Sequence, residues 1–411
     1  MLSGFRNHFQ SEARPDTLPV GQNSPQRLSH DLFAEQLSGS AFTAPRAQNL
    51  KVWLYRLHPS VVQKTPAEPI RHERWTLELS SEGVAPNPYR WSAHPYSRQD
   101  IDWLDSITTY ASHENASVLM YACDRSMENR FFLNADGELL IVPQEGSLEI
   151  HTELGVFSVA PTEVACIPRG MRFQVLLLSG KARGYVCENR GAPFQLPERG
   201  PIGANGLANS RDFETPTAVF HDEKGDFELL TKWNHAFFKT TLEHHPLDVV
   251  AWHGNYVPYR YDLKRFNTIG TVSFDHPDPS IFTVLTSPSE RTGVANIDFV
   301  IFPPRWMVGE HTFRPPYYHR NLMSEFMGLI HGVYDAKAEG FVPGGASLHN
   351  AFVPHGPDVE TFQKATQEEL KPQKITDTLA FMFESNQIFK PSTFALTAAH
   401  LDRDYWRCWQ E

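Results

Sequence analysis

Two histidines and a glutamate in the segment 313–358 constrain this chain more than any other feature of its sequence. Glu325 follows His319 by six residues, and His355 follows Glu325 by thirty. On neighbouring strands of a β-barrel, two imidazoles and one carboxylate can occupy one face of an octahedral metal ion. The three remaining positions stay open, so that ferrous iron, Fe(2+), can hold an organic substrate and O2 together. The spacing therefore predicts a non-haem iron site with these three residues as ligands.

The surroundings of Glu325 favour a ligand role over a structural one. On spacing alone, His319 could equally be a hydrogen-bonded barrel histidine and Glu325 a solvated strand residue. Glu325, however, lies in the apolar run LMSEFMGLI, and a carboxylate buried there costs free energy unless it is paired or binds a metal. The segment also matches the first motif of cupin-type barrels, His-x-His/Asn-(x3–4)-Glu-(x6)-Gly. Its positions here are His319, Asn321, Glu325 and Gly332.

Two histidines compete for the third ligand position. His355 lies in the turn sequence PHGPD, where a histidine is often merely exposed. His349 lies in SLHN, where the spacing Pro-x-Gly-x3-His approximates the last ligand turn of a cupin. The pattern of residues leaves both histidines open as ligands.

Composition excludes several classes of protein. The 411 residues carry a net charge of −11 with a pI near 5.9, whereas a nucleic-acid-binding protein would show a basic stripe. No apolar stretch reaches the roughly 18 residues that a membrane-spanning helix needs, and the polar start MLSGFRNHFQSEARPD lacks the apolar core of a signal peptide. The 4 cysteines form no CxxC pair. We expect a soluble, cytoplasmic protein with reduced thiols and with neither a membrane nor a nucleic acid as partner.

The order of apolar runs and turns predicts a mainly β protein. The 31 prolines and 25 glycines separate many short runs of Val, Ile, Phe, Tyr and Leu. Such runs are dense over residues 116–190 and again over residues 266–383. We expect two cupin-like (jelly-roll) β regions. Residues 1–265 would form an N-terminal arm and a metal-free β domain, and residues 266–411 an iron-binding catalytic domain.

The first β region resembles a copy of the second that lacks its ligands. Phe132, Asn134, Leu139 and Gly146 recur at nearly the intervals of the metal motif. Because apolar side chains stand at ligand positions, we expect this region to bind no metal. Shared turn chemistry between two unrelated β-sandwiches is the alternative explanation.

Residues 1–50 predict an irregular arm. Four prolines interrupt the segment, and its apolar side chains follow no periodic face; these are Phe5, Phe9, Leu32, Phe33, Leu37 and Phe42. Exposed in a monomer, such residues are an aggregation hazard. We therefore expect a homo-oligomer with parts of the arm at subunit interfaces, although an arm that drapes over its own domain fits the sequence equally well.

Several longer motifs carry a resemblance that extends from about Gly4 to Trp409. They are GFRNHFQSEA, LFAEQLSGSAFTAPR, SFDHPDPSIFTVLT, DFVIFPPRW, TFRPPYYHRNLMSEFMGLI, FVPGGASLHNAFVPHGPD and LAFMFES. In this order they resemble the homogentisate 1,2-dioxygenase family. The pairing of RPPYYHRN…SEFMG with PGG-x-SLH…PHGPD is the most specific part of the resemblance.

The resemblance implies a cupin-like enzyme that uses Fe(2+) and opens the ring of homogentisate with O2 to give maleylacetoacetate, a step of tyrosine and phenylalanine catabolism. It also implies a hexamer built as a dimer of trimers. Carried over by position, the resemblance assigns His319, Glu325 and His355 as the iron ligands, with His355 as the third. It makes His276 the acid–base residue at a substrate hydroxyl, and it places Tyr334, His349 and His355 at the substrate.

Three other functions fit parts of the pattern. A related cupin dioxygenase would share the triad but cleave gentisate or a hydroxyanthranilate. A non-catalytic bicupin would store or bind a small ligand, and a metal-dependent sugar-phosphate isomerase would turn over without O2. No G-x-G-x-x-G strand–helix unit and no CxxCH is present to bind a nicotinamide, a flavin or haem.

Overall fold

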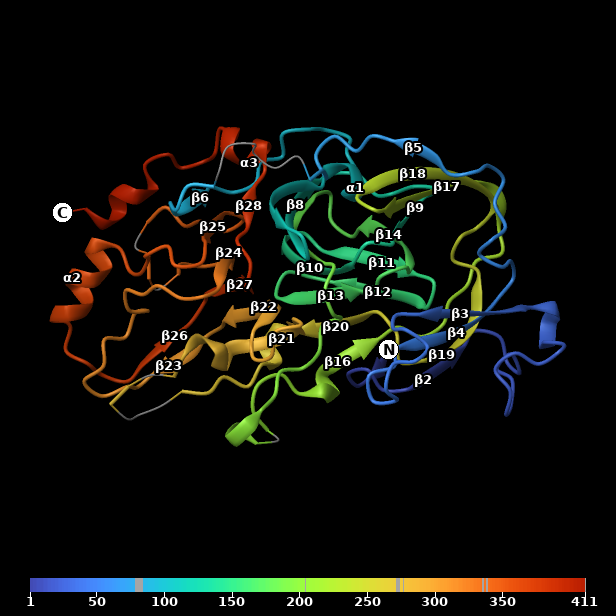
Figure 1. Ribbon diagram of the computed structural model, residues 1–411, viewed down its shortest axis with the longest axis horizontal. Helices are drawn as coiled ribbons and strands as arrows, with labels where there is room; N and C mark the ends of the chain where they lie inside the picture. Colours follow the sequence, from blue (N-terminus) through green and yellow to red (C-terminus); the bar gives the residue numbers. More distant parts are fainter. Residues whose placement is uncertain are drawn as a thin grey trace.

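The computed structural model describes residues 1–410 except 78–83, 204, 271–273, 276, 335 and 338, and it describes Pro201 without its side chain. Within these residues the fold is mainly β, as predicted (Figure 1). The C-terminal region lies to the left in Figure 1, and the first β region fills the centre and right. Cys123, Cys166 and Cys187 are buried as free thiols, which agrees with the reduced cysteines that we expected.

Two sheets form the first β region in the described part of the chain. One has the order β1 (Leu2–Ser3), β16 (Phe213–Thr215), β20 (Tyr259–Asp262), β13 (Glu163–Ile167), β10 (Glu138–Glu145), β15 (Ala182–Asn189), β8 (Ala116–Cys123), β7 (Thr108–His113), β28 (Lys390–Pro391). The other has the order β12 (Gly155–Val159), β11 (Leu148–Thr152), β14 (Arg172–Leu177), β9 (Arg130–Asn134), β17 (Lys224–Trp233), β18 (Ala236–His244), β5 (Glu68–Ile70). Side chains of both sheets share one core, in which Phe132 and Leu139 are fully buried.

The N-terminal arm is irregular over much of its length, but it also contributes strands that its prolines did not indicate. A further sheet has the order β2 (Phe9–Glu12), β19 (Val249–Gly254), β4 (Lys51–Arg56), β3 (Phe33–Ser38). Phe5 packs against Phe213 with ring centroids 4.8 Å apart, so part of the arm covers its own domain. Phe33 and Phe42 remain 49% and 84% exposed.

The C-terminal region carries the sheet that holds the predicted metal residues. Its order is β21 (Thr283–Pro288), β22 (Ala295–Phe302), β27 (Leu379–Ser385), β24 (Ser324–His331), β25 (Ala346–His349), β6 (Tyr89–Trp91), and β23 (Arg305–Met307) pairs separately with β26 (Gln373–Ile375). The helices are α1 (Trp103–Ser106), α2 (Val359–Gln367) and α3 (Thr393–Thr397), with 3-10 turns η1 (Ser29–Asp31), η2 (Gly200–Ile202), η3 (Ser210–Asp212), η4 (Leu263–Arg265), η5 (Pro279–Phe282) and η6 (Tyr405–Trp409). Among the described residues, none of these helices is long and apolar enough to cross a membrane.

The two β regions exchange strands across the predicted boundary between residues 265 and 266. Strand β6 comes from the N-terminal half and pairs with β25, while β28 comes from the C-terminal half and pairs with β7. Side chains also cross, since the Tyr185 hydroxyl donates to the Gly345 carbonyl at 2.6 Å. The division at this position stays a prediction, and the two regions share one continuous core.

A fully buried arginine joins the arm to the first β region. Arg56 on β4 contacts three carboxylates: its Nη1 lies 2.9 Å from Glu35 and 3.0 Å from Glu153, and its Nη2 lies 2.8 Å from Asp248. Each carboxylate belongs to a different segment of the chain. The arginine therefore connects three segments of the chain, and it compensates the charges that they bury.

Arg56→Met should lower the free energy of unfolding by about 3–5 kcal/mol, because it leaves buried carboxylates without their cation. The measurement is chemical denaturation of the variant beside the wild type. Arg125→Met is the matched control, since the Arg125 side chain is 43% exposed and its loss should change the free energy by less than about 0.5 kcal/mol. If both substitutions lowered the free energy of unfolding by equally small amounts, Arg56 and its three carboxylates would not stabilise the fold.

Candidate metal centre

The structure brings His319, Glu325 and His355 together beside the six-stranded sheet. Glu325 is on β24, which pairs with β25 on one side and β27 on the other. The backbones of His319 and His355 form an isolated antiparallel bridge: the N–H of His319 donates to the His355 carbonyl at 2.9 Å, and the N–H of His355 donates back at 3.1 Å. This reciprocal pair fixes both imidazoles next to the strand that carries the carboxylate.

Each imidazole is oriented through the nitrogen that does not face Glu325. His319 Nδ1–H donates to the Tyr317 carbonyl at 2.7 Å, and His355 Nδ1–H donates to the Val353 carbonyl at 2.9 Å. The two Nε2 atoms lie 3.6 Å and 2.9 Å from the Glu325 carboxylate. Metal-binding histidines are commonly held this way, because a carbonyl on the second nitrogen fixes the tautomer and directs the first nitrogen at the ion.

Glu325 is the buried centre of the triad and is 5% exposed. Asn321 Nδ2 donates to its Oε1 at 2.6 Å, which gives the asparagine of the motif a structural role. Burial would raise the pKa of Glu325, but hydrogen bonds from His319 and His355 outweigh burial and hold the pKa below its usual range. The carboxyl is therefore ionised, as a metal ligand must be.

The glycine of the motif closes the end of the same strand. Gly332 follows β24 with a φ of 80°, a conformation that favours glycine. A Cβ at this position would lie 2.0 Å from the Asp377 carbonyl oxygen. Any larger residue would collide with this carbonyl at the end of β24.

Ring orientation separates this triad from two other His–carboxylate groups in the described part of the chain. The rings of His319 and His355 are inclined by 61° with centroids 4.2 Å apart, so an ion can lie on the lone pairs of both. In the other groups the two histidines stack at 22° and 25°. Those groups are His58, His244 and Asp248, and His221, Glu223 and His245. The nitrogen lone pairs lie in the ring planes, so those of nearly parallel, stacked rings do not point at a common position, and neither group is arranged as a preformed metal site.

His349 lies next to the triad but is not arranged as a ligand. Its ring stacks on His355 at 5° and 4.3 Å, so by the same criterion the two rings cannot bind one ion together. Its Nε2 shares a hydrogen bond with the Tyr405 hydroxyl at 3.0 Å. Burial lowers the pKa of His349, which keeps the ring neutral. Of the two histidines that competed for the third ligand position, the geometry favours His355.

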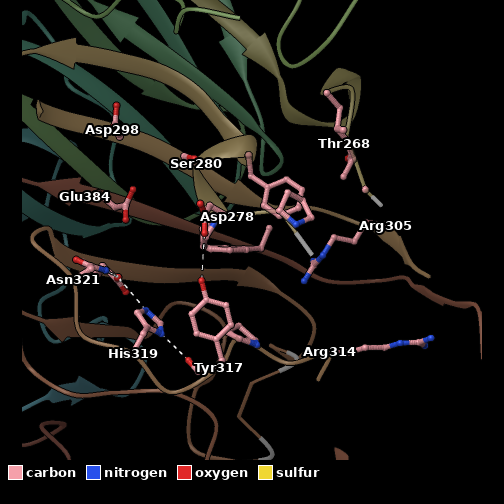
Figure 2. Close-up of a pocket in the computed structure, with 18 of the residues that line it drawn as sticks. Thr268, Asp278, Ser280, Asp298, Arg305, Arg314, Tyr317, His319, Asn321 and Glu384 are labelled. Atoms are coloured by element: carbon pink, nitrogen blue, oxygen red, sulfur yellow. Dashed lines mark hydrogen bonds and ion pairs between the residues drawn. The ribbon is translucent and has the colours of Figure 1, made fainter. Parts of the chain in front are cut away.

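Two cavities meet at the triad, and His319 and Glu325 line both. The larger has a volume of about 890 Å³ and the smaller about 60 Å³. Figure 2 shows the larger cavity, in which the Tyr317 hydroxyl donates to Asp278 at 3.3 Å. A cavity of the larger size accommodates an aromatic molecule, whereas the smaller one has room only for a substituent of such a molecule.

The larger cavity has an acidic side and a basic side. Strand register sets Asp298 opposite Glu384 and Glu384 opposite Glu325, which makes a row of carboxylates across three strands. Burial, together with the charges of Glu325 and Asp298, raises the pKa of Glu384 to about 8. Figure 2 shows Arg305 and Arg314 on the opposite side. With Glu384 protonated near neutral pH, the cavity can accept an anionic ligand on the side of the arginines.

Comparison with known protein families gives the same result for both halves of the chain. Residues 1–263 match the family model described as homogentisate 1,2-dioxygenase N-terminal, and residues 264–411 match the model described as homogentisate 1,2-dioxygenase C-terminal. This chain belongs to the homogentisate 1,2-dioxygenase family. The resemblance carried by its motifs is thereby confirmed.

Solved structures similar to this family member share low identity with it. A glyoxylate-induced protein from Pseudomonas aeruginosa is 12% identical, with 75% of this chain and 97% of that chain covered and a TM-score of 0.32. AerE from Microcystis aeruginosa is 5% identical, with 72% and 98% covered and a TM-score of 0.31. A cupin superfamily protein from Desulfitobacterium hafniense is 11% identical, with 28% and 96% covered and a TM-score of 0.20.

The substrate residues expected from the dioxygenase family are only partly described by the structure. Tyr334 lies just beyond β24, is 8% exposed and lines the smaller cavity together with His349 and His355. Its ring packs against Phe302 with centroids 5.6 Å apart. His276, the expected acid–base residue, lies outside the described residues.

Lys337 is a residue of the smaller cavity that sequence reasoning missed. Its Nζ donates to the Gly356 carbonyl at 2.8 Å and lies 4.3 Å from the centre of the Trp409 ring. Burial lowers the pKa of this lysine to about 8. In the sequence it stands in the polar run DAKAEG, which is indistinguishable from a solvated loop.

In this dioxygenase-family protein, His319→Ala and His355→Ala should each abolish iron retention, because two remaining ligands cannot hold the ion. Elemental analysis of iron per chain after desalting is the measurement. His244→Ala removes a buried imidazole from a stacked group and should leave the iron content unchanged. Iron lost by His349→Ala but retained by His355→Ala would reverse the assignment of the third ligand.

Proposed function

We propose that this protein is an Fe(2+)-dependent ring-cleaving dioxygenase that converts homogentisate and O2 to maleylacetoacetate in tyrosine and phenylalanine catabolism. One observation carries the proposal: two imidazole Nε2 atoms converge on one ionised carboxylate. They do so in a chain whose two halves match the models of the homogentisate 1,2-dioxygenase family.

The donor set suits ferrous iron. Two imidazoles and one carboxylate with open positions are the ligands of non-haem Fe(II) oxygenases, and the set lacks the thiolates that select Cu(I) or iron–sulfur clusters. Ferrous iron held by His319, Glu325 and His355 would let electron density pass from an electron-rich diphenol to O2. The protein's own part is to hold the ion on one side only and to leave the other side to the substrate.

The cavities suit an aromatic ring with an anionic arm. The larger cavity accepts the ring, and the smaller cavity accepts one of its substituents. Tyr334 would donate a hydrogen bond to the substrate, and Lys337 adds a positive charge to the same small cavity. Around them lie buried apolar side chains that exclude water; these are Phe302, Met327, Phe341 and Met382.

His276 is proposed as the acid–base residue at a substrate hydroxyl. Pro277 and Asp278, which follow His276 in the sequence, line the larger cavity. A histidine titrates near neutrality and can accept the phenolic proton and later return it. This assignment comes from the family motif and from the position of the neighbouring residues.

We further propose a cytoplasmic homohexamer, a dimer of trimers, that acts on a small aromatic substrate. The support is the family to which the chain belongs and the aromatic side chains that the N-terminal arm leaves exposed, notably Phe42. Contacts with further subunits would cover these side chains, while the rest of the arm packs on its own domain.

Oxygen uptake after anaerobic loading with Fe(2+) tests the proposed function. We expect consumption of one O2 per homogentisate and formation of maleylacetoacetate. Gentisate lacks the methylene of the acetate arm and should react about 10–200-fold more slowly, the usual effect of one missing methylene. Faster uptake with gentisate or a hydroxyanthranilate would reassign the substrate, and uptake with none of them would refute the dioxygenase.

His276→Asn should retain iron and bind homogentisate but turn over roughly 10²–10⁴-fold more slowly, the usual loss of a general acid–base. Stopped-flow turnover from about pH 6 to 8 is the measurement, since a histidine titrates there. His311→Asn is the control, because His311 is exposed and has a φ of 58° that asparagine also adopts. Near wild-type turnover of His276→Asn across this range would assign the proton to another group.

A further inference from the structure

Tyr405 connects the C-terminal turn η6 to the candidate metal centre. It is 2% exposed and lines the smaller cavity. Its hydroxyl lies 3.0 Å from Nε2 of His349, and the ring of His349 stacks on the proposed ligand His355 at 4.3 Å. A residue from the tail of the chain thus contacts the histidine that adjoins the proposed iron ligand.

Two cations lie over the ring of Tyr405. The guanidinium carbon of Arg90 is 4.3 Å from the ring centroid, and Nζ of Lys337 is 5.5 Å from it. Arg90 is itself held by Asp402 at 2.9 Å. Positive charge at the ring draws electron density away from the phenolic oxygen. The hydroxyl is therefore a better donor than acceptor, which favours a hydrogen bond from the Tyr405 hydroxyl to Nε2 of His349.

The direction of this hydrogen bond decides which nitrogen of His349 carries the proton. A neutral imidazole that accepts at Nε2 bears its hydrogen on Nδ1. His349 is 3% exposed, and its Nδ1 has no hydrogen-bond partner among the residues that the structure describes. A buried N–H without an acceptor is unfavourable. An oxygen that entered the smaller cavity would satisfy it, and the charge of Lys337 in the same cavity favours an anionic oxygen.

We propose that Tyr405 is a positioning residue of the active site: its hydroxyl fixes the tautomer of His349, so that Nδ1–H is presented to an anionic oxygen of the substrate. This inference rests on the proposed function, because the substrate supplies that oxygen. The oxygen belongs either to the carboxylate of the acetate arm or to a ring hydroxyl that has lost its proton.

Anaerobic calorimetric titration of the iron-loaded protein tests the proposal without turnover. Tyr405→Phe keeps the ring under its cations and removes only the hydroxyl. It should weaken homogentisate binding about three- to tenfold, the loss of one hydrogen bond, with unchanged iron content. When Tyr405→Phe is added to a protein that already carries His349→Gln, Kd should change less than about twofold. The reason is that Tyr405 acts on the substrate through His349.

Two further ligands locate the oxygen. Phenylacetate carries only the carboxylate arm and hydroquinone only the ring hydroxyls. The ligand whose Kd rises in Tyr405→Phe contains the oxygen that His349 contacts. Tyr256→Phe is the matched control, because its buried hydroxyl donates to the Arg169 carbonyl at 2.8 Å in the first β region. That variant should leave every Kd unchanged.

Equal losses of affinity in the wild-type and His349→Gln backgrounds would overturn the proposal, as would unchanged binding by Tyr405→Phe or an equal loss in Tyr256→Phe. Should His349→Gln fail to fold, as judged by thermal unfolding, His349→Asn provides the second background. If the wild type consumes O2 and Tyr405→Phe weakens binding equally with and without His349→Gln, only the role of Tyr405 is refuted. A wild type that neither binds these ligands nor consumes O2 refutes the proposed function as well.

Discussion

An ionised carboxylate in the middle of an apolar strand is the constraint on which the rest of this structure depends. Removing the charge of Glu325 from water is costly unless several donors surround it. Asn321 supplies one donor, and the imidazoles of His319 and His355 supply the others when Nε2 carries a proton, whereas a metal ion takes their place when Nε2 is free. The backbone bridge between the two histidines places both donors at once. The same charge acts on the next strand, where it helps to keep Glu384 protonated.

Proximity of histidines and carboxylates is a weak criterion for a metal centre in this chain. Three such groups occur among the described residues, each with ligand atoms within 4.8 Å of one another. Only in the group of His319 and His355 are the rings inclined so that two lone pairs can meet. In the stacked pair of His58 and His244, Nδ1 of His58 instead lies 3.1 Å from Asp248. Ring orientation, rather than the number of nearby ligands, separates a metal centre from a polar core.

The sequence predicted those parts of the fold and site that depend on local pattern. Alternating apolar runs indicated β structure, and the intervals between His319, Glu325 and Gly332 indicated the motif. Asp298 and Glu384 could not be predicted as cavity residues, because their place depends on the register between strands far apart in the chain. The same holds for Lys337 and Tyr405 and for the strands of the N-terminal arm. Each is placed by a long-range contact, and local periodicity carries no signal of such contacts.

The exchange of strands between the two β regions has a consequence for how the molecule assembles during synthesis. Strand β6 leaves the ribosome long before β25, the strand it covers in the metal-bearing sheet. Until then its backbone groups lack their partners, and without β6 the edge of the later sheet would be open to pairing with other chains. Strand β6, from the early part of the chain, therefore covers the exposed edge of the later sheet as soon as β25 forms. A C-terminal half made by itself would lack that protection next to His349.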